Sequence, residues 1–205
     1  MRIAILGASG RTGSTLVGQA LERGHEVVAL VRTPAGTTGP VPDPRRLEVR
    51  QADVTVPGGF PAIGDVDVVV AAIGISKGDG PGALTAGARR LAEAGVRTVW
   101  LGALGSGGSR RSGGLIYAGA MRMFVGSELA EKAEADEIAL KADATVFHAP
   151  DVTDGPLSAT RSVVPLADLR RPLLPPRISR ATLASLLLDE AETGGPGNGI
   201  VVPLT

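Results

Sequence analysis

The chain has 205 residues, 43% hydrophobic and 20% charged, which is typical of one globular domain with a sizeable core. Lysine plus arginine equals aspartate plus glutamate, 21 each, and only 2% of residues are aromatic, so neither nucleic acid nor an anionic membrane is a favoured partner. The absence of cysteine excludes disulfides and thiol chemistry, and two histidines are too few to favour a histidine-rich metal site.

Apolar segments with strand character alternate along the chain with segments whose apolar residues recur at helical spacing. In chain order we expect a strand over 2–6, a helix over 12–23, strands over 26–31, 47–52 and 66–73, a helix over 82–94, a strand over 97–101, a helix over 127–140, a strand over 144–148, a helix over 179–192 and a strand over 199–203. This alternation predicts βαβ units. The expected fold is α/β, with residues 1–205 forming a single-domain, Rossmann-like, doubly wound parallel sheet that carries helices on both faces.

The segment "GASGRTG" joins the first expected strand to the first expected helix. Gly7 would allow a sharp turn off the strand, Gly10 would let the backbone approach a pyrophosphate, and Gly13 would let the helix pack closely on the sheet. The helix N-terminus would offer N–H groups to the phosphates. The alternative is a tight strand-to-helix turn with no ligand, but the position in the first βαβ unit favours dinucleotide binding.

The end of the second strand indicates which dinucleotide would bind. A site for NAD usually has an acidic residue there for the ribose 2′-hydroxyl, whereas this strand ends "ALVRTP", with Arg32 in that place. An arginine can hold a 2′-phosphate through two hydrogen bonds, and Arg11 could reach the same phosphate. The sequence therefore favours NADP(H), unless both arginines are simply solvated.

Residues after the third and fourth strands complete the expected cofactor site. Asp53 could accept a hydrogen bond from the adenine amino group beside Val54, or be an ordinary turn aspartate, and the small residues of "AAIG" would let the cofactor lie across the sheet edge. The expected cofactor-binding residues are Gly7, Ser9, Gly10, Arg11, Thr12, Gly13, Arg32, Thr33, Asp53, Val54, Ala72, Gly74 and Lys132.

The sequence resembles the atypical short-chain dehydrogenases/reductases, in particular the NAD(P)H-binding subgroup that includes flavin and biliverdin-IXβ reductases and NmrA-like proteins. The resemblance covers nearly the whole chain and is carried by "GASGRTG", "VVALVRTP", "QADVT", "VDVVVAAIG", "AGVRTVWLGALGSG", "TDGPL" and "ISRATLASLLLDEAE". It implies one domain that takes NADPH and, in those members that are enzymes, transfers hydride to flavins, quinones, tetrapyrroles or other conjugated acceptors. Loops around 102–117 and 149–178 would then border the acceptor.

The chain departs from the wider family at its proton relay. The resemblance implies a serine after the fifth strand and a Tyr-x-x-x-Lys pair on the next helix. Here Gly102 and Ala103 follow Leu101, and Lys132 has Glu128 four residues before it in place of tyrosine. Tyr117 lies too far from Lys132 to share one helical turn with it. The relay is therefore missing, which fits an acceptor that needs only hydride from the protein site and takes its proton from solvent.

Two side chains are candidate catalytic residues. The resemblance implies that Lys132 holds the nicotinamide ribose, and His148, at the end of a strand, could act as an acid or an orienting donor. The alternatives are a solvated lysine and a structural histidine. In the loop after the fifth strand, Arg110 and Arg111 could attract an acidic acceptor, and Asp154 and Gly155 would shape a turn over the nicotinamide.

These observations lead to an NADPH-dependent oxidoreductase that transfers hydride to a flat conjugated acceptor of the flavin, quinone or bilin type. The alternatives are an NmrA-like sensor that binds NADP(H) without catalysis and acts through a protein partner, and a cofactor-retaining isomerase or cyclase. We expect a monomer or homodimer with a small-molecule acceptor and no bound metal, nucleic acid or membrane. The first residues have no signal-peptide pattern and no apolar stretch reaches membrane-spanning length, so we expect a cytoplasmic protein.

Overall fold

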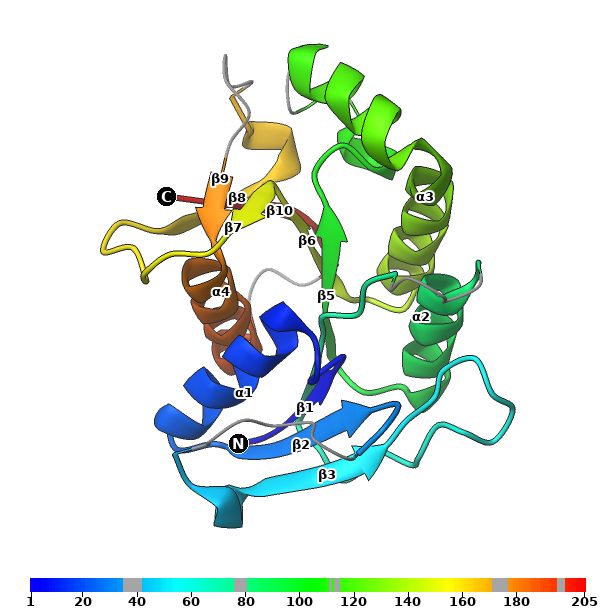
Figure 1. Cartoon of the computed structure of the whole chain (residues 1–205), viewed down its shortest axis with the longest axis vertical. Coiled ribbons are helices and arrows are strands. Elements are labelled where there is room, and N and C mark those ends of the chain that lie inside the picture. The colour runs from blue at the N-terminus through cyan, green and yellow to red at the C-terminus, as the bar shows by residue number, and fades with distance from the viewer. Residues whose placement is uncertain (35–41, 76–80, 111, 113–114, 171–176, 195–197) are drawn as a thin grey trace.

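An eight-stranded sheet runs through the centre of the molecule, in the order β3-β2-β1-β4-β5-β6-β10-β8 (Figure 1). The computed structural model describes residues 1–34, 42–75, 81–110, 112, 115–170, 177–194 and 198–205, with the backbone alone over 115–127. Neighbouring strands pair in parallel except β10 and β8, which are antiparallel. The strands are β1 (Arg2–Leu6), β2 (Glu26–Val31), β3 (Leu47–Gln51), β4 (Val68–Ala71), β5 (Thr98–Ala103), β6 (Thr145–Ala149), β8 (Ser162–Pro165) and β10 (Gly199–Leu204).

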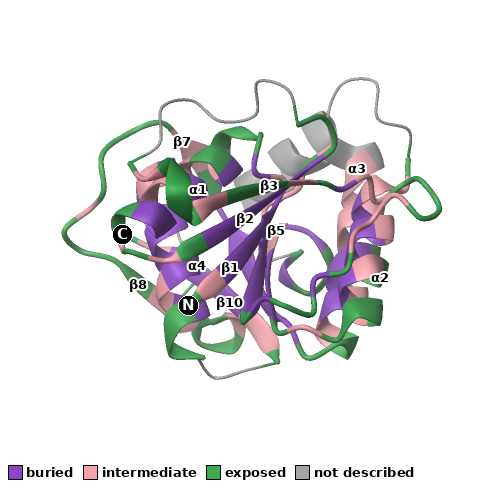
Figure 2. Cartoon of the chain, turned by 90° about the horizontal axis from the view of Figure 1, so that it is seen from below, coloured by how far each residue is buried: buried purple, intermediate pink, exposed green. Residues whose placement is uncertain are grey.

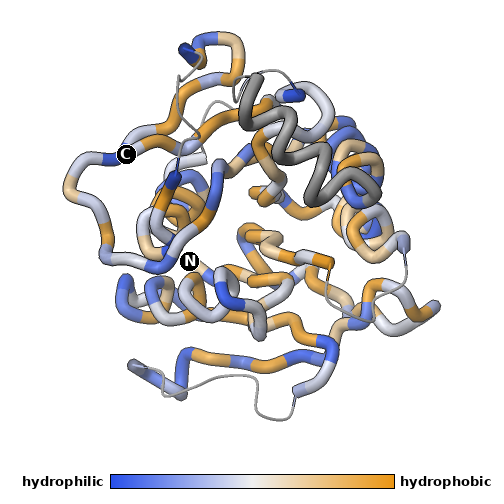
Figure 3. The backbone as a smooth tube through the Cα atoms, turned by 45° about the horizontal axis from the view of Figure 1, so that its top comes forward, coloured by the Kyte–Doolittle hydropathy of each residue, from blue (hydrophilic) through white to orange (hydrophobic). Residues whose placement is uncertain are grey.

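Two pairs of helices cover the two faces of this sheet. Helices α1 (Arg11–Glu22) and α4 (Arg180–Thr193) pack together on one face, and α2 (Ala83–Ala94) and α3 (Leu115–Lys141) on the other (Figure 1). The central strands and the inner faces of the helices are buried (Figure 2), and hydrophobic stretches follow the strands (Figure 3). The predicted doubly wound α/β fold is confirmed. None of the helices in the described part of the chain is long and apolar enough to cross a membrane.

Most element bounds agree with the sequence prediction, and one helix is much longer than expected. Strands β1 and β2 have the predicted bounds, and Ser179 caps α4 by accepting a hydrogen bond from the Thr182 N–H at 3.1 Å. Helix α3 begins at Leu115 rather than at 127, so it takes up the end of the predicted loop over 102–117. Its first part has a single charged residue, Arg122, where the later turns have many, and it contains glycines, which have low helix propensity.

The sequence did not indicate three short strands in the 149–178 region. Strands β7 (Asp151–Thr153) and β9 (Arg177–Ser179) pair in parallel as a separate two-stranded sheet, and β8 joins the edge of the main sheet. Strands of three or four residues are too short to show an alternating pattern. Their pairing partners also lie far away in the sequence, so no local signal marks them.

The turn from β1 into α1 depends on a very close backbone contact. A Cβ atom added to Gly13 would lie 2.0 Å from the carbonyl oxygen of Gly7, well inside van der Waals distance. Gly7 itself has a φ of +83°, which favours glycine, and a Cβ there would lie 2.7 Å from the carbonyl oxygen of Ala72. The start of α1 is therefore held directly against the loop that leaves β1, as the glycine spacing predicted.

Replacing Gly13 by alanine should destabilise the protein by about 3 kcal/mol, because the added methyl group must push α1 away from the Gly7 carbonyl. Gly18→Ala is the matched control on the same helix, since a Cβ at Gly18 meets no atom within 4 Å among the described residues. That control should stabilise the protein by up to about 1 kcal/mol through helix propensity. Urea denaturation measures both, and equal stability of the two variants would contradict the proposed contact.

A buried carboxylate ties α3 to the ends of β5 and β6. Asp136 is 3% exposed, and its Oδ1 accepts a hydrogen bond from Trp100 Nε1 at 3.0 Å. Its Oδ2 lies 2.8 Å from Ser106 Oγ and 3.0 Å from His148 Nε2. Burying a carboxylate without hydrogen-bond partners costs free energy, and these three partners offset that cost for Asp136.

The same network continues into the loop that follows β5. His148 Nδ1 lies 2.6 Å from Ser109 Oγ, and that hydroxyl accepts a hydrogen bond from the Gly105 N–H at 2.8 Å. Both His148 and Ser109 are fully buried. These hydrogen bonds hold the first residues of the loop after β5 in place.

Asp136→Ala should lower the free energy of unfolding by about 3 to 5 kcal/mol, because it leaves buried donors, among them His148 and Trp100, without an acceptor. Glu137→Ala, the exposed neighbour on α3, should change stability by no more than about 0.5 kcal/mol. Chemical denaturation of both variants checks this. A small effect of Asp136→Ala would show that the buried network contributes little.

Candidate functional site

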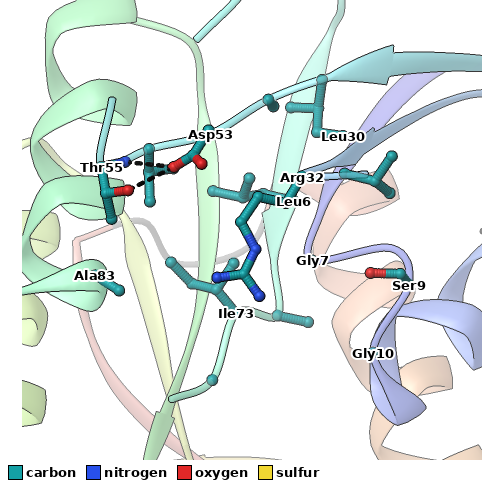
Figure 4. A pocket seen from close by; sticks show the side chains of 15 residues that line it. Leu6, Gly7, Ser9, Gly10, Leu30, Arg32, Asp53, Thr55, Ile73 and Ala83 are labelled. Carbon is teal, nitrogen blue, oxygen red and sulfur yellow. Dashed lines mark hydrogen bonds between the residues drawn. The ribbon is translucent and has the colours of Figure 1, made fainter. Parts of the chain in front are cut away.

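A cavity of about 240 Å³ lies at the carboxyl ends of β1, β2, β3 and β4 (Figure 4). Strands β2 and β3 lie on one side of β1, and the chain then crosses to β4 on the other side. Ligands of open α/β folds bind at such a topological switch point. Eight of the expected cofactor-binding residues line this cavity: Gly7, Ser9, Gly10, Arg32, Asp53, Val54, Ala72 and Gly74.

The glycine loop forms one wall of the cavity and leads directly into α1. The Gly10 N–H donates to the Gly7 carbonyl at 2.9 Å, and the Ser14 N–H donates to the Gly10 carbonyl at 2.8 Å as the helix begins. Gly10 is the N-cap residue and has no side chain to occupy the helix end. Thr12 and Gly13 lie in the first helical turn behind it. The positive end of the helix dipole therefore borders the cavity, which suits a phosphate group.

Arg32 and Asp53 bring opposite charges to the other side of the cavity. The Arg32 side chain extends into the space between the glycine loop and the Asp53 segment (Figure 4). Asp53 Oδ1 accepts hydrogen bonds from the N–H of Thr55 at 2.9 Å and from its hydroxyl at 2.6 Å. These bonds, chiefly the one from the hydroxyl, lower the pKa of Asp53, and the charge of Arg32 lowers it further. Asp53 is therefore an anion at neutral pH. Thr33 follows Arg32 and is not among the residues that line the cavity.

The structure does not bring Arg11 together with Arg32. Arg11 is the first residue of α1, and its guanidinium forms an ion pair with Asp154 on the exposed surface. It is not among the residues that line the cavity. The expectation that both arginines grip the same phosphate therefore has no support in this arrangement, since only Arg32 of the two lines the cavity.

A second, smaller cavity of about 140 Å³ lies between the end of β5 and α3. Ile73 lines both cavities, so they adjoin along the sheet edge. Lys132 lines the smaller one beside Gly102 and Ala103, which is the relative position that the family resemblance implies. The ammonium group of Lys132 donates to Glu128 Oε2 at 3.0 Å, so the residue in the tyrosine position is a counter-ion.

Gly102, near the end of β5, lies directly against the buried Asp136–His148 pair. A Cβ at this position would lie 2.7 Å from Asp136 Oδ1 and 3.0 Å from the ring of His148. The buried Asp136–His148 pair therefore occupies the space that a larger side chain would need. Asp136 itself lines the smaller cavity and was not expected as a site residue. The available signal was an aspartate among the alanines of α3, four residues after Lys132.

His148 is placed as a structural residue. It is fully buried, and both ring nitrogens have partners within the protein, Asp136 and Ser109. It does not line either cavity, so it is not positioned to donate a proton to an acceptor. This arrangement favours the structural alternative for His148, and Lys132 stays a predicted site residue. Arg111 lies outside the described residues, and Tyr117 lies on α3 where the backbone alone is described.

Solved structures with the same fold come from several bacteria. A short-chain dehydrogenase/reductase from Veillonella parvula, in complex with NADP, has a TM-score of 0.82 and 14% sequence identity, with 100% of this chain and 94% of that chain covered. A candidate NADH-flavin reductase from Streptococcus pneumoniae has a TM-score of 0.74 and 20% identity, with 100% and 99% covered. The oxidoreductase ylbE from Lactococcus lactis has a TM-score of 0.76 and 17% identity, with 100% and 91% covered. At these identities the likeness shows a common fold.

The family is established by sequence. The model of a family described as NAD(P)H-binding matches residues 7–193, which runs from the first glycine of the loop to the end of α4. This match confirms the predicted resemblance and agrees with the geometry of the larger cavity. The chain belongs to the NAD(P)H-binding family.

Proposed function

We propose that this protein is an NADPH-dependent oxidoreductase that reduces a flat conjugated acceptor of the flavin, quinone or bilin type. The observation that carries the proposal is the setting of Lys132: it lines the smaller cavity with Gly102 and Ala103, where the family resemblance implies a serine, and it pairs with Glu128, where the resemblance implies a tyrosine. The name of the Streptococcus pneumoniae neighbour points to the same class of acceptor.

The residues of the larger cavity suit NADPH. Gly7 and Gly13 leave no space for a Cβ, so the loop and the start of α1 form a cradle of bare backbone for a pyrophosphate. The guanidinium of Arg32 offers the paired N–H donors that a ribose 2′-phosphate needs, and Asp53 is not at the position where an acidic residue would hold a 2′-hydroxyl. The Veillonella parvula neighbour, which was solved with NADP, supports this choice.

The reduction needs little acid–base chemistry from the protein. Bound NADPH supplies a hydride, and the acceptor takes a proton from solvent to complete a two-electron reduction. Lys132 would hold the nicotinamide ribose by its ammonium group, and Glu128 keeps that group in place. The Asp136 carboxylate, with three hydrogen-bond partners, holds the floor of the smaller cavity in place.

Wild-type protein should bind NADPH more tightly than NADH, and Arg32→Asp should reverse that preference. A charged hydrogen-bond donor contributes about 1.5 to 3 kcal/mol, so the affinity for NADPH should fall by about tenfold or more. Calorimetric titration with each nucleotide measures the change, with Arg45→Asp, an exposed arginine outside the cavity, as the control. Tighter binding of NADH by the wild type would show that Arg32 does not select the cofactor.

Turnover should occur with FMN, quinones or biliverdin and not with simple ketones, because ketones need the missing relay. The reaction is monitored by the loss of absorbance at the nicotinamide band. Lys132→Met should reduce kcat/KM by about tenfold or more through loss of a charged hydrogen bond, while Lys141→Met at the end of the same helix should not. Tight NADPH binding without turnover on any of these acceptors would overturn the proposal and favour a sensor.

A further inference from the structure

Two arginines from neighbouring helices converge on one carboxylate beside the candidate site. Arg11 and Arg180 are the first residues of α1 and α4, which pack together. Arg11 forms an ion pair with Asp154 Oδ2, and Arg180 Nη2 lies 3.2 Å from Asp154 Oδ1. Two guanidinium groups facing one carboxylate leave one positive charge unbalanced within this group of three residues.

Arg180 is only partly satisfied by this arrangement. The residue is 9% exposed, and its Nε has no hydrogen-bond partner among the described residues. An arginine usually presents Nε and one Nη together to the two oxygens of a carboxylate or phosphate. Asp154 reaches one of these nitrogens, so the guanidinium retains the capacity for a second oxygen atom.

The three residues lie at the edge of the sheet where the cofactor and acceptor are expected. Arg11 directly follows Gly10 of the larger cavity, and Asp154 follows β7, which continues from the end of β6. Figure 1 shows the starts of α1 and α4 near each other on the side of β7 and β9. Arg11, Asp154 and Arg180 line neither the larger nor the smaller cavity. Because Asp154 lies in the 149–178 region that is expected to border the acceptor, we assign this charge to the acceptor rather than to the pyrophosphate.

Asp154 can give way to a ligand. Its side chain is 70% exposed and that of Arg11 is 73% exposed, and exposed ion pairs of this kind are weak. A ligand oxyanion that replaced Asp154 would meet Arg11 and the unsatisfied edge of Arg180 at once. Asp154 therefore has the position of an internal counter-ion that holds the two arginines when no ligand is bound.

We propose that Arg11 and Arg180 bind a phosphate or carboxylate group of the acceptor, with Asp154 as the group that the ligand displaces. This inference rests on the proposed reductase function and narrows its substrate class to acidic conjugated acceptors. FMN and riboflavin provide a matched pair of probes, because they share the same ring system and differ by one phosphate group.

The test measures KM and kcat for FMN and riboflavin with NADPH, together with the dissociation constant of each flavin from its fluorescence quenching. Wild type should prefer FMN, and Arg11→Gln and Arg180→Gln should each weaken FMN binding by about tenfold while leaving riboflavin binding unchanged. Asp154→Asn should tighten FMN binding and leave riboflavin unaffected. Arg89→Gln, which removes an exposed ion pair between α2 and α3, is the control and should change neither flavin.

The outcomes separate this inference from the proposed function. Equal binding of FMN and riboflavin by the wild type, or equal losses for both flavins in the arginine variants, would overturn the anion site. Weaker NADPH binding in those variants with an unchanged FMN preference would also overturn it, because the arginines would then serve the cofactor. Absence of turnover with every acceptor would remove the proposed reductase function, while the fluorescence measurements would still test the site. If Arg180→Gln does not fold, the exposed Arg11→Gln and Asp154→Asn variants provide the same test.

Discussion

The close approach of α1 to the loop after β1 determines the geometry of the cofactor site. Gly13 lies so near the Gly7 carbonyl that only a hydrogen atom fits between them, and Gly7 in turn lies against the backbone after β4. This contact places the start of a helix, with its positive dipole end, at the point where the chain reverses direction across the sheet. The larger cavity, Arg32 and Asp53 are arranged around that fixed point.

A second constraint acts at the other end of the site. Asp136 and His148 form a buried polar network that holds the loop after β5, and the network occupies the volume next to Gly102. A serine at Gly102 and the Asp136–His148 pair are therefore mutually exclusive in this arrangement. Under the proposed function, Lys132 would bind the cofactor without a relay serine beside it, which would suit acceptors that take their proton from solvent.

The sequence was sufficient for seven of the eight strands of the main sheet, all but β8, and for eight residues that line the larger cavity. Strands β1 and β2 are short apolar runs with clear ends, and the spacing of Gly7, Gly10 and Gly13 has a direct geometric meaning. Arg32 could be placed because it ends a strand that pairs with β1. These features depend on residues that are close together in the sequence, so they can be predicted from a single sequence.

The remaining features depend on contacts between distant segments. The pairing of β7 with β9 and the ion pair of Arg11 with Asp154 join residues far apart in the chain. The sequence left the role of His148 open for the same reason, because its contact with Asp136 joins a strand end to the inner face of a helix. A local pattern shows which residue types are present, but it does not show which of them meet in the folded protein.

We propose that this fold holds NADPH for hydride transfer to an acceptor that needs no proton relay from the protein. The most direct measurement is NADPH oxidation by the purified protein with FMN, followed at the nicotinamide absorbance band and compared with NADH. We expect turnover with FMN, a clear preference for NADPH and loss of that preference in Arg32→Asp. Binding of NADPH without oxidation in the presence of flavins, quinones and biliverdin would rule out the proposed reductase.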